Sequence, residues 1–267
     1  MNLESICESV VAISHLAANY IREHSNVLLL SDIEEKGSHD LVSFVDKNTE
    51  TMIKDALVPL LSDAGFLAEE SGITAGNEFT WVIDPLDGTT NFVHGVPVYS
   101  ISIALLQANK PILGVVHEVS RMECFYSSLG TGVFLNGKQV KVSKASKLDK
   151  SLIATGFPYN DFSRMEAYLK VFDSLMRETR GIRRLGSAAV DLAYVACGRF
   201  EAFYEYGLHP WDVAAGAFLV NQAGGEVTDF SGEDNYLFGT DILASNRLIH
   251  NNLKDIIDLF FLKKQSS

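Results

Sequence analysis

The sequence predicts a layered α/β protein made of two halves, residues 1–147 and 148–267, each with a sheet and helices. Strand-like segments follow one another between about residues 98 and 140, which is typical of a sheet meander. After Lys150, strand-like and helix-like segments alternate, which is typical of an α/β arrangement. A chain of 267 residues can also bury roughly three quarters of the surface that it exposes when unfolded. We therefore expect two half-domains, an N-terminal α+β half and a C-terminal α/β half, with a site in the cleft between them.

The composition is that of an acidic globular chain. Hydrophobic residues make up 47% of it and charged residues 21%, and it contains no low-complexity tract, charge block or repeat. The net charge of -12 argues against a nucleic acid or an anionic membrane as the main partner. The first residues do not have the basic and apolar order of a secretory signal, and no apolar stretch is long enough to span a bilayer.

Three cysteines, Cys7, Cys124 and Cys197, form an odd and scattered set without the spacing of metal ligands. Buried free thiols in a reducing compartment are the expected state of such a set. The sequence therefore predicts a cytoplasmic location.

The first segment of the chain predicts an amphipathic helix. Its apolar residues are spaced by four and three and form one core-facing stripe: Ile6, Val10, Ile13, Ala17 and Tyr20. We interpret His15 and His24 as surface or packing residues of this helix. Residues 34–43 are polar and contain a glycine, which predicts a mobile loop and then a short strand. Asp46 precedes a helix-like segment over residues 47–57 and is a good N-cap, worth about 1 kcal/mol.

Residues 64–68 predict a short strand that delivers Glu69, with a loop over residues 70–77 after it. Neighbouring side chains of an extended backbone face opposite ways, so Glu69 and Glu70 cannot both point inward, and we expect Glu69 to do so. Four consecutive strands follow, the last with a hairpin turn at Asn136-Gly137: residues 98–106, 112–119, 123–127 and 133–140. We interpret His94 and His117 in this region as hydrogen-bonded structural residues.

An acidic turn after a buried strand is the strongest functional signal. Apolar residues run into Asp84, and Pro85 offers no backbone N–H, so the strand is expected to end at Asp84. The pair Asp87-Gly88 closes a tight turn. Such a turn aims the side chains of Asp84 and Asp87, and the Leu86 carbonyl, into one small volume.

Two converging carboxylates repel one another unless one is protonated or a cation lies between them. Oxygen ligands without a nearby cysteine or histidine favour a hard cation, Mg²⁺ before Zn²⁺. A purely structural turn is equally compatible with these dipeptides. The spacing does not fit a calcium loop of the EF-hand type or the two aspartates of a haloacid dehalogenase-type phosphatase.

The second half predicts strands at residues 152–155 and 200–204, the latter leading into Glu205, and helices at residues 162–176 and 188–197. Small residues over 183–189 begin the second helix, where free N–H groups can receive substrate oxygens, although ordinary close packing is an equal alternative. Pro210 suits the start of another helix and places Asp212 in its first turn, where it could compensate the helix dipole. A strand at residues 242–244 and a helix from about Leu248 close the chain.

Four blocks of the sequence together resemble the inositol monophosphatase family. They are Ala68-Glu-Glu-Ser71, Asp84-Pro-Leu-Asp-Gly-Thr-Thr-Asn-Phe92, Trp211-Asp-Val-Ala-Ala-Gly216 and Gln222-Ala-Gly-Gly225. They occur in the order of that family, and the similarity extends from about Lys36 to about Asn246. The resemblance implies a layered αβαβα fold like that of sugar phosphatases.

The resemblance also implies roles for individual residues. The metal ligands would be Glu69, Asp84, the Leu86 carbonyl, Asp87 and Asp212, with every acidic ligand retained. Catalysis would depend on Glu69, on Thr89, and on Asp46, which lies near the metals in the family and helps to orient the attacking water. The substrate contacts would be Gly88, Thr89, Gly186, Ser187, Ala188, Asp212 and Glu205, the last bonded to a substrate hydroxyl.

The implied activity is hydrolysis of a polyol phosphate monoester by a water that two or three Mg²⁺ ions activate, with myo-inositol 1-phosphate the favoured substrate. Bound metal would also offset the repulsion between an acidic chain and an anionic ester. The pair Thr90-Asn91 favours the inositol branch, because similar nucleotide and histidinol phosphatases usually carry Lys after the Gly-Thr pair.

Two alternatives stay open at this point. The chain could be a related phosphatase acting on a sugar phosphate, histidinol phosphate or adenosine bisphosphate. It could instead be catalytically idle and bind a macromolecular partner, with the carboxylates holding a structural cation. The resemblance further implies sensitivity to lithium and a homodimer.

Overall fold

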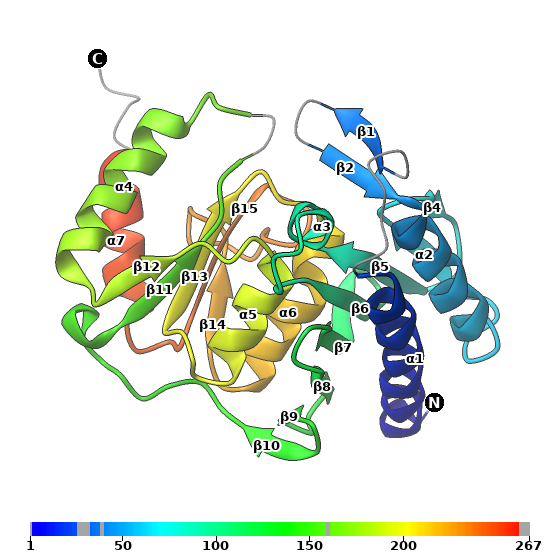
Figure 1. Ribbon diagram of the computed structural model, residues 1–267. Coiled ribbons are helices and arrows are strands. Elements are labelled where there is room, and N and C mark those ends of the chain that lie inside the picture. The colour runs from blue at the N-terminus through cyan, green and yellow to red at the C-terminus, as the bar shows by residue number, and fades with distance from the viewer. Residues whose placement is uncertain (1, 26–32, 38–39, 159–160, 262–267) are drawn as a thin grey trace.

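The computed structural model describes residues 2–25, 33–37, 40–158 and 161–261, which form three sheets and the helices around them (Figure 1). The largest sheet contains β3 (Gly65–Ala68), β4 (Gly72–Thr74), β5 (Phe79–Asp87), β6 (Ser100–Gln107), β7 (Lys110–Glu118), β8 (Glu123–Ser128), β9 (Val133–Leu135) and β10 (Lys138–Val140). Its strand order is β10-β9-β8-β7-β6-β5-β3-β4. The second sheet contains β11 (Leu152–Thr155), β12 (Gly181–Arg183), β13 (Ala202–Tyr206), β14 (Glu226–Thr228) and β15 (Asp241–Ser245), in the order β12-β11-β13-β15-β14. The strands β1 (Ile33–Gly37) and β2 (Asp40–Ser43) form a separate antiparallel pair.

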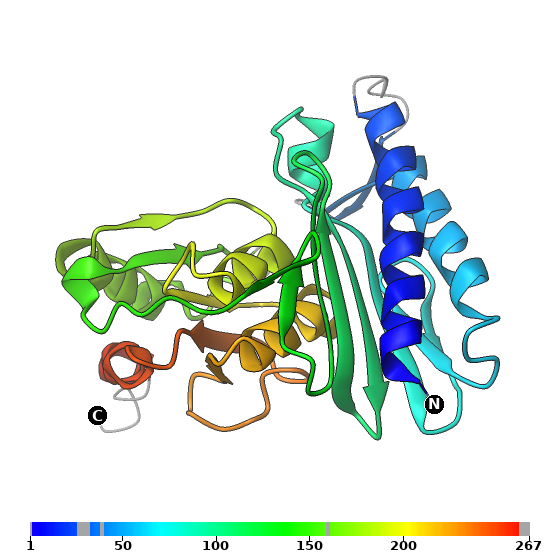
Figure 2. The ribbon, with the colours of Figure 1, turned by 90° about the horizontal axis from the view of Figure 1, so that it is seen from below.

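The helices complete five layers in the order helix, sheet, helix, sheet, helix. They are α1 (Leu3–His24), α2 (Phe44–Leu57), the short α3 (Thr89–Val93), α4 (Met165–Glu178), α5 (Ala188–Ala196), α6 (Pro210–Gln222) and α7 (His250–Phe261). The helices α1 and α2 cover the outer face of the eight-stranded sheet, α5 and α6 lie between the two large sheets, and α4 and α7 cover the far face of the five-stranded sheet (Figure 2). The predicted αβαβα architecture is confirmed.

The strands of the two large sheets do not interleave along the chain, because the larger sheet ends at Val140 and the smaller begins at Leu152. The domain boundary between residues 147 and 148 stays a prediction.

In the part of the chain that the structure describes, no helix combines the length and apolar character needed to cross a bilayer.

Most predicted elements are confirmed with small shifts of their ends. The N-terminal helix buries the stripe Cys7, Val10, Ser14, Ala17, Ala18 and Ile21 against the sheet. The meander of four strands is present. The segment predicted as its last strand forms the hairpin β9-β10, whose turn residues Asn136 and Gly137 have positive φ angles of 46° and 80°. The helix expected over residues 162–176 is α4, which begins three residues later, at Met165.

Several boundaries predicted from the sequence are wrong. The strand expected to end at Asp84 continues to Asp87 through a bulge, because pairing with β6 resumes beyond Pro85. The segment from Ile33 to Gly37, expected as a loop, pairs with β2. The predicted loop over residues 70–77 contains β4, which pairs with β3. The strands β12 and β14 have only three residues each, too few for an apolar pattern to predict them.

The central helix layer packs closely on both sides because small residues stand at its contacts. A Cβ on Gly216 of α6 would lie 2.5 Å from the Leu192 Cβ of α5, and one on Gly114 of β7 would lie 2.9 Å from the Ala215 carbonyl oxygen. Real side chains do not approach so closely, so only glycine fits at these two positions. The close approach brings the start of α6, with Asp212, to the end of the larger sheet.

Candidate active site

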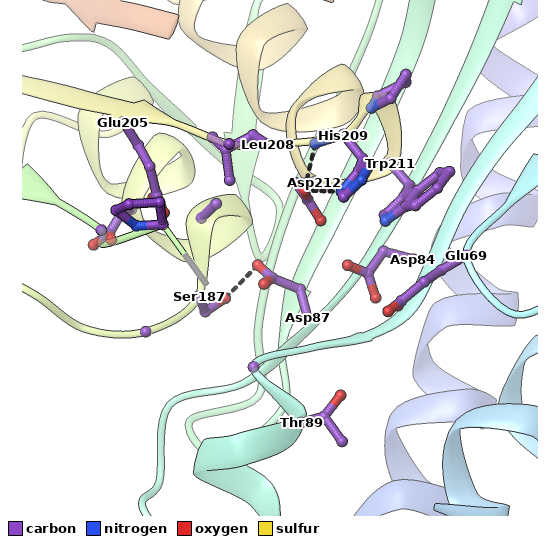
Figure 3. Close-up of a pocket in the computed structure, with 18 of the residues that line it drawn as sticks. Glu69, Asp84, Asp87, Thr89, Ser187, Glu205, Leu208, His209, Trp211 and Asp212 are labelled. Atoms are coloured by element: carbon purple, nitrogen blue, oxygen red, sulfur yellow. Dashed lines mark hydrogen bonds and ion pairs between the residues drawn. The ribbon is translucent and has the colours of Figure 1, made fainter. Parts of the chain in front are cut away.

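A cavity of about 600 Å³ lies between the two halves and collects the predicted site residues (Figure 3). Those that line it are Glu69, Asp84, Leu86, Asp87, Gly88 and Thr89 from the first half, and Gly186, Ser187, Ala188, Glu205 and Asp212 from the second. Asp46 is buried behind this wall and contacts the cavity residues through Thr89. Of the two neighbouring glutamates Glu69 and Glu70, only Glu69 lines the cavity, as predicted.

A β-bulge in β5 aims the first two aspartates. Asp84 pairs with Ser102 and Asp87 with Ser100, so β5 has one residue more than β6 between these pairs. Proline is tolerated there because a bulged residue makes no ladder hydrogen bond, and Pro85 has no N–H to lose. The N–H of Leu86 instead donates to Asp84 Oδ1 at 2.9 Å, which holds the buried carboxylate at the bend.

Asp87 joins the two halves at the start of α5. Its Oδ2 accepts hydrogen bonds from Ser187 Oγ at 2.6 Å and from the Ala189 N–H at 2.7 Å (Figure 3). Ser187 is the N-cap of α5, and its hydroxyl in turn accepts from the Val190 N–H at 3.3 Å. A negative charge at a helix N-terminus is favourable, so part of the donor capacity of this helix start is already used by Asp87.

Two glycines allow the loops of the halves to touch beside the cavity. Gly88 has φ 97°, and a Cβ there would lie 3.1 Å from the carbonyl oxygens of Gly186 and Val98. The side chain of Asn91 fastens the same contact, because its Nδ2 donates to Val98 O at 2.7 Å and to Leu185 O at 2.8 Å. The position of Gly186 relative to the aspartates is therefore set by backbone contacts.

Thr89 and Asp46 form a hydrogen-bonded pair at the floor of the cavity. Thr89 Oγ1 lies 2.9 Å from Asp46 Oδ1 and 3.0 Å from the Leu86 carbonyl oxygen. The interpretation of Asp46 as an N-cap is wrong, since α2 begins at Phe44 and places Asp46 within its first turn. The side chain of Asp46 is 1% exposed and accepts from Thr89.

Asp212 lies in the first turn of α6, where Pro210 is the first helical residue as predicted. Its Oδ2 accepts from the His209 N–H at 2.7 Å in a capping box, so the aspartate does stabilise the helix start. The carboxylate also faces the cavity opposite Asp87 (Figure 3). The local role in the helix and a role in the site are therefore compatible.

The carboxylates of the cavity oppose one another's ionisation. Burial raises the pKa of Asp84 well above its ordinary value, and the charges of Glu69 and Asp87 raise it further. Burial, followed by the charge of Asp212, raises the pKa of Asp87 to about 7 although Ser187 and backbone N–H groups donate to it. A cation among these oxygens would remove the repulsion, and carboxylate and carbonyl oxygens are the donor set of a hard divalent ion. The residues present therefore fit the predicted Mg²⁺.

The metal-free protein should lose stability as the pH rises through the ionisation of Asp87. With its pKa raised to about 7, the folded chain retains a proton that the unfolded chain releases near pH 4, so unfolding becomes easier between these values. Urea unfolding with a chelator at about pH 5 and about pH 8 should show this fall, and Asp87→Asn should reduce it. An unchanged fall in the variant would show that Asp87 is not its source.

Sequence reasoning missed Asp191, a buried aspartate on α5 that lines the cavity. Its Oδ1 has no hydrogen-bond partner among the described residues, and burial together with the charge of Glu205 raises its pKa. The signal was present, because Asp191 is the one charged residue of an otherwise apolar helix. Also missed were Arg184, which lines the cavity, and the stacked pair His209 and Trp211, whose ring centroids are 4.8 Å apart.

A sequence model of the inositol monophosphatase family matches residues 2–259. The chain belongs to the inositol monophosphatase family. Among solved structures, this family member resembles the inositol monophosphatase of Anabaena at 35% identity and a TM-score of 0.86, covering 97% of this chain and 98% of that one. It resembles the extragenic suppressor protein SuhB of Bartonella henselae at 35% identity and a TM-score of 0.90, covering 98% and 99%.

Relatives by sequence carry a different kind of name. The protein named Nus factor SuhB in Pseudomonas aeruginosa is 44% identical over 220 residues, which is 80% of this chain and 81% of that protein. The Nus factor SuhB of Escherichia coli K12 is 41% identical over 232 residues, 86% and 87% of the two chains. The family and the architecture predicted from the sequence are thus confirmed, and the chain is a member of a phosphatase family.

Proposed function

We propose that this chain hydrolyses a phosphate monoester of a polyol, with Mg²⁺ as cofactor and water as the nucleophile. The observation that carries the proposal is the convergence of Glu69, Asp84, Asp87 and Asp212 from both halves on one cavity. Together with the Leu86 carbonyl, these carboxylates would hold two or three Mg²⁺ ions. When bound, the metal supplies charge neutralisation for the phosphoryl and leaving oxygens and acidifies water.

Thr89 and Asp46 are proposed to position the attacking water. Because the hydroxyl proton of Thr89 is donated to Asp46, the lone pairs of Oγ1 are free to accept a hydrogen bond from a water in the cavity. Asp46 is fully enclosed, so its carboxylate holds the hydroxyl in one orientation. Glu69 lies at the same wall of the cavity, where its carboxylate can accept a proton from that water.

The second half is proposed to bind the ester. Gly88, Gly186, Ser187 and Ala188 surround the space next to Asp87, where backbone groups can approach a phosphoryl oxygen. Glu205 faces the same space, and a Cβ on Gly156 would lie 2.0 Å from its Oε2, so only glycine leaves room for this carboxylate. An acceptor in such a place is suited to a hydroxyl of the alcohol part of the substrate.

Replacing Glu205 by Gln should raise KM for inositol 1-phosphate by roughly tenfold and change kcat little, because a charge-assisted hydrogen bond becomes a neutral one. The same variant should hydrolyse p-nitrophenyl phosphate as the unchanged protein does, since that ester offers no hydroxyl. Steady-state kinetics with both esters would test this. An equal loss of kcat/KM with both esters would mean that Glu205 supports the site as a whole and does not bind the alcohol part of the substrate.

The choice of substrate is tested by a panel of inositol 1-phosphate, a sugar phosphate, histidinol phosphate and adenosine bisphosphate, with phosphate release measured at saturating Mg²⁺. We expect the highest kcat/KM with inositol 1-phosphate. Release of phosphate from none of the four would contradict the proposal and favour a binding protein with a structural cation.

Lithium at millimolar concentration should inhibit turnover, and sodium at the same concentration should not. The oxygen-rich cavity can hold Li⁺ in place of Mg²⁺, and its single charge is too small to assist product release. Initial rates measured over a Li⁺ series at saturating Mg²⁺ would show it. Insensitivity would separate this chain from the Li⁺-sensitive members while leaving a phosphatase in place. A homodimer is proposed on the same family resemblance, and a cytoplasmic location on the three free cysteines.

A second candidate function is that of a Nus factor, the name carried by relatives at 41% and 44% identity. This role would differ from the expectation that nucleic acid is not a partner of the chain. Expression of this chain and of its Asp87→Asn variant in an Escherichia coli strain that lacks its own SuhB would separate the two functions. Equal complementation by both would place the Nus role outside the acidic cavity, and failure of both would count against that role.

A further inference from the structure

A second group of potential ligands lies outside the acidic cavity. His15 is on α1, His117 is in β7 and Cys124 is in β8, directly opposite His117 in the antiparallel ladder. One ring nitrogen of each histidine and the sulfur of Cys124 all lie within 4.8 Å of one another. His15 lies on α1, which covers the outer face of the eight-stranded sheet (Figure 2), and none of the three residues lines the acidic cavity.

The hydroxyl of Ser14 organises this group. Ser14 Oγ donates its only proton to the Val11 carbonyl oxygen at 2.8 Å. It lies 3.1 Å from His117 Nδ1 and 3.8 Å from Cys124 Sγ, so while it donates to Val11 it can accept from the ring N–H and from the thiol. In this arrangement the neutral His117 ring carries its proton on Nδ1.

The other nitrogen of His117 is then a lone pair without a donor. The residue is 0% exposed, and its Nε2 has no hydrogen-bond partner in the described part of the chain. A buried polar atom without a partner is costly in a folded protein, so it calls for an explanation such as a bound ion. The ring of His15 contacts that of His117 edge-on, with centroids 4.5 Å apart.

We propose that His15, His117 and Cys124 form a binding site for a divalent cation of the zinc class, which fastens α1 to the sheet. Two imidazoles and a thiolate are a donor set for Zn²⁺ and related ions and a poor one for Mg²⁺. The bond from His117 Nδ1–H to Ser14 is the outer hydrogen bond that metal-bound histidines usually make. Binding releases the thiol proton of Cys124, and water completes the coordination.

The three ligand atoms must move closer together before they can bind one ion. Bond lengths of about 2.0 to 2.3 Å in a tetrahedron place ligand atoms roughly 3.4 to 3.6 Å apart, roughly 1.2 to 1.4 Å less than the 4.8 Å limit of the separations here. Rotation of the His15 side chain can supply this, because it is partly exposed and not locked in the core. The site does not depend on the proposed phosphatase activity, since none of its residues lines the acidic cavity.

Cobalt tests the site through the sulfur. Added to the metal-free, reduced protein, Co²⁺ should produce a thiolate-to-metal charge-transfer band, which carboxylates of the acidic cavity cannot produce. Cys124→Ser should abolish the band, and the matched variant Cys197→Ser should keep it, because Cys197 is a free thiol outside the group. Far-ultraviolet circular dichroism would show that both variants are folded.

A competition of Zn²⁺ against bound Co²⁺, followed in the same band, gives the affinity. His15→Ala is a change at a partly exposed position. It should lower the affinity for both ions by at least about tenfold, the scale of losing support at a metal site. In the unchanged protein Zn²⁺ should raise the melting temperature more than in Cys124→Ser. Absence of the sulfur band, or a band that survives at full intensity in Cys124→Ser, would overturn the proposal.

Discussion

Asp87→Asn lowers kcat by about 10²- to 10³-fold or more while the chain stays folded, because the site loses a charge aimed at the reacting phosphoryl group. Asp87 both contacts the start of α5 and faces the other acidic side chains. Asparagine keeps an oxygen that can accept from Ser187 and from the Ala189 N–H, so the contact between the halves survives. Loss of activity with retained structure would therefore report on charge.

The matched control is Asp149→Asn, which removes the same charge from an exposed position outside the cavity. Its activity should equal that of the unchanged protein. Phosphate release and thermal unfolding would be measured for both variants across a Mg²⁺ titration. More than about a tenth of the normal activity in Asp87→Asn at saturating Mg²⁺ would contradict the assignment of Asp87 as a shared metal ligand.

Thr89→Ala lowers kcat by roughly 10²-fold with a modest change in KM, the scale of losing one well-placed polar group from an active site. The hydroxyl follows Asp87-Gly88 directly, so the bend that aims the carboxylates also places Oγ1 in the cavity. Asp46 accepts its proton at 2.9 Å and so fixes the direction of its lone pairs. Without the hydroxyl, a water in this place loses its orientation.

Thr89→Ser is the control for that variant, since it restores the hydroxyl and should recover most of the lost activity. Asp46→Asn should resemble Thr89→Ala, because a neutral amide holds the hydroxyl more weakly than a carboxylate does. Steady-state measurements of kcat and KM for the three variants test this role of the hydroxyl. A fully active Thr89→Ala would remove Thr89 from the positioning of water.

The convergence of the acidic side chains on one cavity could be predicted because they stand at element ends with strong local signals. Pro85, the pair Asp87-Gly88 and Pro210 each restrict the backbone, and the predicted neighbours do line one cavity. The end of β5 was misjudged because a bulge lets the ladder with β6 resume, which depends on the partner strand. The N-cap interpretation of Asp46 was wrong because α2 begins two residues earlier, at Phe44.

Contacts between segments that are distant in the sequence could not be predicted from local sequence patterns. Asp191 is the one charged residue of an apolar helix, but its proximity to Glu205 and Asp87 depends on other elements of the fold. The three cysteines show no ligand spacing along the chain, yet the register of β7 and β8 sets Cys124 opposite His117, and α1 adds His15. Short strands such as β4 and β12 arise from pairing with a neighbour and carry no periodicity of their own.

We expect a water held at Thr89, and not a side chain of the protein, to attack phosphorus. Thr89 has no histidine or lysine within its motif to activate it as a nucleophile, whereas water next to a divalent metal ionises readily. A single turnover in ¹⁸O-labelled water, with enzyme in excess over inositol 1-phosphate, tests this most directly. We expect label in the phosphate of that first turnover and no phosphorylated peptide. Unlabelled phosphate, or a phosphothreonine at Thr89, would contradict it.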